Sequence, residues 1–107
     1  MENSTIIDSK NYVISSAESS VAEISYDGNK NIQYLPASPY SIFPNLTVLS
    51  AANCSIKEIS NLNFKMLYKL EKIKLPHNQL EEILSDTFDG LDQLIFLDLG
   101  KTNFQLH

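Results

Sequence analysis

The chain has 107 residues, with 8 Lys or Arg against 13 Asp or Glu, and a net charge of −5. This acidic balance excludes a nucleic-acid binder, whose phosphate contacts need a basic face. A single cysteine, Cys54, excludes an internal disulfide, and no apolar run reaches the roughly 18–20 residues of a membrane span, so burial of apolar side chains must hold a small domain together.

Residues 1–20 are predicted to form an N-terminal flank and cap. The stretches NYVISS and VAEISYDGN, at residues 11–16 and 21–29, are predicted to form two short strands around a polar turn. We therefore expect a β-hairpin that covers the first unit of the domain, with residues 1–10 frayed outside it.

From residue 21 to 107, apolar residues recur with a period of 24, which indicates a repeat architecture. The unit at 70–93 sets the template with Leu70, Ile73, Leu75, Asn78, Leu80, Ile83, Phe88 and Leu91. The unit at 46–69 matches it with Leu46, Leu49, Ala51, Cys54, Ile56, Ile59, Phe64 and Leu67. A partial unit at 94–107 continues it with Leu94, Leu97, Leu99, Thr102 and Phe104.

The partial unit at 21–45 precedes these, and its second half fits the template with Ile32, Leu35, Tyr40 and Phe43. Its first half is looser: Val21, Ile24 and Tyr26 match only if one residue is inserted before Ile32. Because alternate residues of a strand face opposite sides, each unit is expected to give one short strand to a parallel sheet. The rest of each unit returns across the core as irregular or short helical turns.

The position of Asn78 is where the chain turns out of the strand. A buried amide there can satisfy backbone groups of neighbouring turns. Cys54 and Thr102 replace Asn at the equivalent positions. We expect Cys54 to be a buried structural thiol.

The pattern LxxLxLxxNxLxxIxxxxFxxLxxL resembles the leucine-rich repeat, and its 24-residue length resembles the "typical" extracellular class of that family. The stretch YLPASPYSIFPNLTVL is similar to the N-terminal part of insect receptor-like and innate-immune members. The resemblance implies an α/β leucine-rich repeat solenoid, with a short parallel sheet on the concave face and irregular or short helical turns on the convex face. The chain stops inside a unit, which suggests a fragment with an uncapped C-terminal edge.

The residues that the template leaves free are the candidates for binding. On the concave sheet they are Glu23, Ser25, Val48, Ser50, Lys72, Lys74, Phe96 and Asp98, continued by the loop residues Asn53, His77 and Lys101. Of these, Val48, Ser50, Lys72, Lys74, Phe96 and Asp98 are predicted to bind a protein ligand, because mixed charge around an aromatic anchor is typical of a protein interface. Phe96 can equally be a residue covered by a further coil or a dimer partner.

No catalytic, cofactor or metal constellation is found in the sequence. The two histidines, His77 and His107, have no readable partner, and the acidic run near Asp89 and Asp92 fits a solvated convex face better than a calcium site. The lysines Lys57, Lys65, Lys69, Lys72 and Lys74 could receive an acidic partner or simply keep the surface soluble. We therefore predict no enzyme and no cofactor.

Three sequons occur, at Asn3, Asn45 and Asn53, and the last two lie at coil edges where a glycan could sit. The resemblance implies a secreted protein, yet MENSTIIDSK has no feature of a secretory signal, so a cytoplasmic location stays open. The leading hypothesis is a non-enzymatic protein-recognition module, in extracellular recognition or innate immunity. The alternative is an assembly fragment that associates through its open C-terminal edge.

Overall fold

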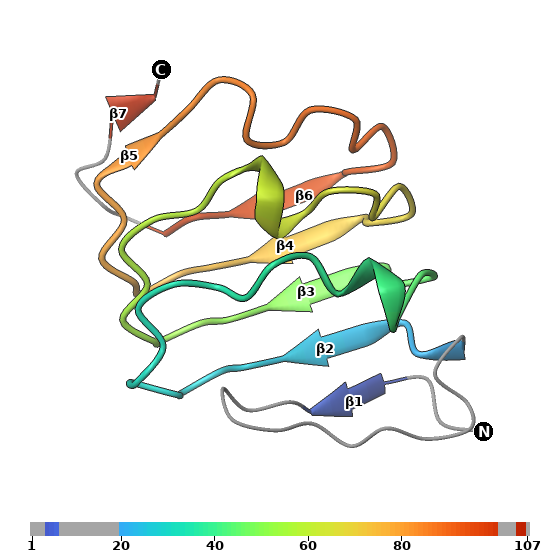
Figure 1. Cartoon of the computed structure of the whole chain (residues 1–107). Helices are drawn as coiled ribbons and strands as arrows, with labels where there is room; N and C mark the ends of the chain where they lie inside the picture. Colours follow the sequence, from blue (N-terminus) through green and yellow to red (C-terminus); the bar gives the residue numbers. More distant parts are fainter. Residues whose placement is uncertain (1–3, 7–19, 101–104, 107) are drawn as a thin grey trace.

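The structure, a computed structural model, describes residues 4–6, 20–100 and 105–106. Its main element is a five-stranded parallel sheet in the order β1-β2-β3-β4-β6 (Figure 1). The strands are β1 (Ser4–Ile6), β2 (Glu23–Ser25), β3 (Val48–Ser50), β4 (Lys72–Lys74) and β6 (Phe96–Asp98). A smaller parallel pair joins β5 (Glu82–Ile83) to β7 (Gln105–Leu106). A parallel sheet with few helices fits a repeat fold.

The register of the sheet follows the period read from the sequence. Val48 pairs with Lys72 and Lys72 with Phe96, so both steps are 24 residues long. Glu23 pairs with Val48, a step of 25 residues. The extra residue of this first step confirms the insertion predicted before Ile32.

Two of the return segments contain a short helical turn, as expected. The 3-10 helix η2 (Pro39–Ser41) starts at Ser38, whose hydroxyl accepts a bond from the Tyr40 amide, and proline suits its first turn. In η3 (Asn61–Asn63), the Ser60 and Asn63 side chains form a reciprocal capping box. The Asn63 amide also donates to the carbonyl of Leu35 in the preceding unit, at 3.1 Å. The return segments are therefore tied to one another as well as to the sheet.

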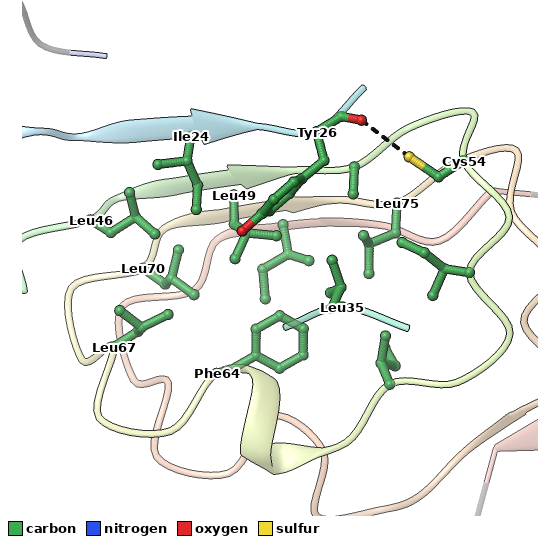
Figure 2. Packing of buried hydrophobic residues seen from close by; sticks show 14 of the residues in the cluster. Ile24, Tyr26, Leu35, Leu46, Leu49, Cys54, Phe64, Leu67, Leu70 and Leu75 are labelled. Atoms are coloured by element: carbon green, nitrogen blue, oxygen red, sulfur yellow. Dashed lines mark hydrogen bonds between the residues drawn. The ribbon is translucent and has the colours of Figure 1, made fainter. Parts of the chain in front are cut away.

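The core lies between the sheet and the return segments. The predicted inward positions of unit 46–69 are all buried: Leu46, Leu49, Ala51, Cys54, Ile56, Ile59, Phe64 and Leu67. Figure 2 shows several of these side chains directed from the strands towards Phe64 on the return path. The rings of Phe64 and Phe88 then pack across two units, with centroids 5.5 Å apart. Equivalent residues thus form continuous columns through the stack.

Two predictions about the first unit are wrong. Tyr40 does not fill the aromatic column, because η2 has no buried residue and Tyr40 is 36% exposed. Phe43, predicted at the inward position equivalent to Leu91, is buried. The N-terminal hairpin is not formed at β2, since both neighbours of this strand, β1 and β3, are parallel to it. Residues 4–6, expected to be frayed, form β1; residues 11–16 lie outside the described residues.

Candidate functional site

The sheet brings the six predicted binding residues together in two rows. One row runs through Val48, Lys72 and Phe96, and the other through Ser50, Lys74 and Asp98. Neighbouring strands lie about 4.8 Å apart, so each row is a short line of adjacent side chains. Glu23 and Ser25 of β2 extend the two rows by one strand.

Exposure separates these residues into two kinds. Lys72 is exposed, Phe96 is 45% exposed, and Val48, Lys74 and Asp98 are half-buried. Ser50, by contrast, is only 4% exposed. The prediction that Ser50 belongs to the binding surface is therefore wrong, and we define the strand face as Val48, Lys72, Lys74, Phe96 and Asp98.

Asp27 is the hydrogen-bond partner of the buried Ser50 side chain. The Ser50 hydroxyl donates to Asp27 Oδ1 at 2.7 Å, and the same oxygen accepts a bond from the Ala52 amide, also at 2.7 Å. One carboxylate thus satisfies a side chain and a backbone group of the next unit. The only signal in the sequence was the place of Asp27 just past β2, opposite the end of β3.

Positive charge dominates the centre of the strand face. Within the described residues, neither Lys72 nor Lys74 has an ion pair or a hydrogen bond from its ammonium group. Asp98 stands at one end of its row and accepts a bond from the Gly100 amide at 2.9 Å. Lys72 beside Phe96, with Lys74 in the neighbouring row, favours a ligand with carboxylate and apolar groups.

The loop positions next to the strand face share one backbone conformation. Asn53 and His77, at equivalent places in two units, have φ values of 56° and 61°. This left-handed conformation is tolerated by Asn and His better than by β-branched residues. Both side chains are exposed, whereas Lys101 lies outside the described residues.

The two described sequons differ in exposure. The Asn53 side chain is exposed and accepts a bond from Lys30 Nζ. Asn45 is half-buried, and its oxygen accepts a bond from Lys69 Nζ at 2.8 Å. In the folded protein, Asn53 therefore offers more room for a glycan than Asn45.

Cys54 occupies the turn position, and its environment disfavours a nucleophile. Its thiol is 4% exposed and donates to the carbonyl of Tyr26 at 3.2 Å (Figure 2). Burial raises the pKa of this thiol above its ordinary value of 9.0. Because the reactive species is the thiolate, Cys54 is a structural residue, as predicted.

Other functions would need a metal site or a membrane-spanning helix. Across residues 20–100, no three His, Cys, Asp or Glu side chains come together as a metal site. In the same part of the chain, no helix has the length and apolar character needed to cross a membrane. The strand face is thus the candidate site that the described residues offer.

A parallel sheet built from 24-residue units, with free side chains on its outer face, defines a repeat protein of the kind that binds other proteins. The chain matches the family described as Leucine rich repeat over residues 44–104, more than half of its length. It therefore belongs to the leucine-rich repeat family, whose members commonly mediate protein–protein interaction. None of the curated proteins compared with it matches.

Proposed function

We propose that this protein is a non-enzymatic recognition module that binds another protein through the strand face. The observation that carries the proposal is the register, which aligns Lys72 with Phe96 on adjacent strands while leaving both exposed. Aromatic residues such as Phe96 are enriched at protein interfaces, and a charge such as that of Lys72 orients an oppositely charged partner. Val48 and Asp98 flank these residues and are half-buried. They add contact area while losing little side-chain freedom when a ligand binds.

The sheet supplies the rigidity that such a face needs. Val48 and Lys72 sit on strands whose inward neighbours, Leu49 and Ile73, are packed in the core, so their backbones are fixed before a ligand arrives. Fixed anchors lower the entropy lost on binding. An extended acidic segment with an apolar residue would match the row, its carboxylates on the lysines and its apolar side chain on Phe96.

A peptide library displayed on phage tests the proposal. Peptides selected on the wild-type protein are synthesised, and their dissociation constants are measured on single variants. Lys72→Glu and Phe96→Ala should each weaken binding by at least about fivefold, the effect of roughly 1 kcal/mol. Glu81→Lys, a charge reversal on the exposed return path, is the matched control and should change binding little.

The opposite pattern of binding would overturn the proposal. Selected peptides that bind both strand-face variants with unchanged affinity, and lose binding to Glu81→Lys, would place the site on the return path. Circular dichroism of each variant shows that it is folded before its affinity is compared.

We also propose a secreted setting with a glycan on Asn53. The resemblance to the extracellular class and the exposure of Asn53 support this. The protein is expressed behind a secretory leader in eukaryotic cells and treated with an enzyme that removes Asn-linked glycans. This treatment should lower the apparent mass of the product. In a background in which Asn3 is replaced by Gln, Asn53→Gln should abolish that shift, whereas Asn45→Gln should keep it; retention of the shift in the Asn3→Gln, Asn53→Gln double variant contradicts the assignment.

Association through the C-terminal end is the second candidate function. Ile95 is 76% exposed and Leu97 is 41% exposed, and both lie at the last strand of the sheet. Large apolar groups in such positions mark interaction surfaces. Sedimentation velocity over a concentration series tests it: association that Leu97→Lys abolishes supports the assembly function, and a monomer at every concentration rejects self-assembly.

A further inference from the structure

A pocket opens on the return path, where the unit at 46–69 meets the unit at 70–93. Its volume is about 360 Å³, and we call its main lining residues the junction pocket: Leu62, Lys65, Met66 and Tyr68 of the first unit, and Asp89 and Gly90 of the second. The strands of these two units, β3 and β4, are each paired on both sides. The pocket is therefore formed by inner units of the stack.

Three large apolar side chains are exposed in the junction pocket although the repeat template does not require them. Leu62 is 62% exposed, Tyr68 is 56% exposed and Met66 is 39% exposed. One period later the same positions hold two aspartates and a glycine, so the fold accepts polar or small residues there. Apolar groups gathered around one pocket, rather than scattered singly, are typical of an interaction surface.

Met66 is held in a backbone conformation that suits glycine. Its φ is 72°, and Gly90, at the same place in the next unit, has a φ of 83°. Asn and His adopt this left-handed conformation more readily than Met does, and the other described non-glycine residues with positive φ are Asn53 and His77. The strain places the Met66 side chain beside Tyr68, whose hydroxyl donates to the Met66 sulfur at 3.2 Å. Backbone strain of this kind is found preferentially at functional sites.

Contacts with both neighbouring units hold the walls of the pocket in place. The Ser38 amide donates to the carbonyl of Leu62 at 3.0 Å, and the Ser38 hydroxyl donates to the carbonyl of Lys65 at 2.7 Å. On the other side, the Asn61 side chain donates to Asp86 Oδ2 at 3.4 Å. A pocket whose backbone is fixed in advance loses little entropy when a ligand enters.

The charge at the junction pocket changes sign from one unit to the next. Lys65 lies on the first unit and Asp89 on the second, both are exposed, and neither side chain has an ion pair or hydrogen bond with any residue that the structure describes. The contrast extends beyond the pocket: residues 46–74 carry five lysines against two glutamates, whereas residues 75–100 carry six carboxylates and no Lys or Arg. A complementary partner therefore needs an anion on one side of its apolar group and a cation on the other.

We propose that the junction pocket binds a segment of a partner protein that presents a large apolar side chain between an acidic and a basic one on a single face. The apolar side chain would contact Leu62, Met66 and Tyr68. The partner's carboxylate would lie towards Lys65 and its cation towards Asp89. Residues one turn apart on a helix provide this arrangement. The junction pocket shares no residue with the strand face, so the inference is independent of the proposed function.

Fluorescence anisotropy with labelled, alanine-rich helical peptides tests the proposal on the full chain. A peptide with Glu, Leu and Lys one turn apart on one face should bind. Replacing its Leu by Ala should weaken binding by at least about tenfold, because the apolar contact is lost. Peptides with Lys at both charged positions, or Glu at both, should bind at least about threefold more weakly, because one of the two charges then meets a like charge.

Variants of the apolar wall locate the binding. Tyr68→Ser should weaken the Glu, Leu and Lys peptide by at least about fivefold. Tyr34→Ser is the matched control, because Tyr34 is equally exposed, at 57%, and lies outside the junction pocket. Met66→Gly relieves the strained backbone, so it should be at least as stable as the wild type in urea while binding the peptide at least about threefold more weakly.

Variants of the two charges test the orientation of the partner. Lys65→Glu and Asp89→Lys should each weaken binding by about threefold. The double variant exchanges the two charges and should regain most of the affinity, because the helical peptide can lie on it in the reverse direction. Lys72→Glu, on the strand face, should leave this binding intact, so a failure here is distinct from a failure of the strand-face function.

Three results would overturn the proposal. The first is equal affinity for the Leu peptide and its Ala counterpart, including binding of neither. The second is an equal loss of affinity in Tyr34→Ser and Tyr68→Ser. The third is a double charge variant that binds no better than the single ones, since this would show that the two charges do not act as a complementary pair.

Discussion

The side chain of Asn78 joins the turns of two successive units. Its oxygen accepts bonds from the amides of Cys54 and Ile56, at 3.2 and 3.1 Å, and its nitrogen donates to the carbonyl of Ala51 at 2.8 Å and to that of Leu75 at 3.1 Å. Cys54, one unit earlier, has only its thiol to donate. A single amide thus satisfies backbone groups that would otherwise be buried without partners.

Replacing Asn78 by alanine should therefore be costly. Ala has no group to accept from the Cys54 and Ile56 amides, and each unsatisfied buried polar group costs about 1–3 kcal/mol. We expect Asn78→Ala to lower the free energy of unfolding by at least about 2 kcal/mol in urea titrations. Gln79→Ala, at an exposed neighbouring side chain, should change it little; equal losses would contradict the role given to Asn78.

Cys54 should make stability fall at alkaline pH. Burial raises the pKa of its thiol above the ordinary value of 9.0, so the folded state favours the neutral form. A group with a raised folded pKa contributes its full stability below the unfolded pKa and loses it as the pH rises through the folded pKa. Above pH 9.0, the unfolding free energy of the wild type should therefore decline more steeply than that of Cys54→Ala. Parallel pH profiles would show that the thiol is not desolvated.

The inner strand β4 separates core from surface within three residues. In β4, Ile73 is fully buried between Lys72 and Lys74, and the buried Leu75 follows directly. The short strand is therefore stabilised by the inward side chains, while the outward ones remain free to vary. This division allows a binding face to change without loss of the fold.

Leu75 and Lys74 test this division with adjacent residues. Leu75→Ala removes a completely buried side chain and should cost about 2–5 kcal/mol. Lys74→Ala should cost less than about 0.5 kcal/mol, as surface substitutions do. Chemical denaturation of both variants measures the difference, and similar midpoints would reverse the assignment of inward and outward positions.

The inward positions, and the number of residues between paired positions on neighbouring strands, could be predicted because both follow from the 24-residue period. Ser50 is outward by its place in the strand, but it is buried and donates to a carboxylate 23 residues earlier in the chain. Tyr40 fitted the aromatic column by spacing alone, and the 3-10 turn at Pro39 leaves it partly exposed. Such outcomes depend on contacts between units that differ from the template, so periodicity cannot supply them.

The molecule as a whole is stabilised unevenly along its stack. Leu49 and Ile73 have a unit on both sides, whereas Leu97 has one on a single side and is 41% exposed. In repeat proteins each unit contacts only its neighbours, so the terminal unit opens at the lowest free energy. Stability therefore falls from the inner units towards β6.

Amide hydrogen exchange followed by NMR should report this gradient. We expect the amides of Leu49 and Ile73 to exchange at least about tenfold more slowly than that of Leu97, because opening β6 leaves the inner units intact. Uniform protection across β3, β4 and β6 would indicate a single cooperative unit instead.

The constant register also determines how the strand face can be detected by other molecules. Neighbours in a row are 24 residues apart from β3 to β6, although their strands lie about 4.8 Å apart. A linear peptide shorter than one period therefore contains only one member of each row. Antibodies against this face will recognise a discontinuous epitope, visible on the native protein and lost on a denaturing blot.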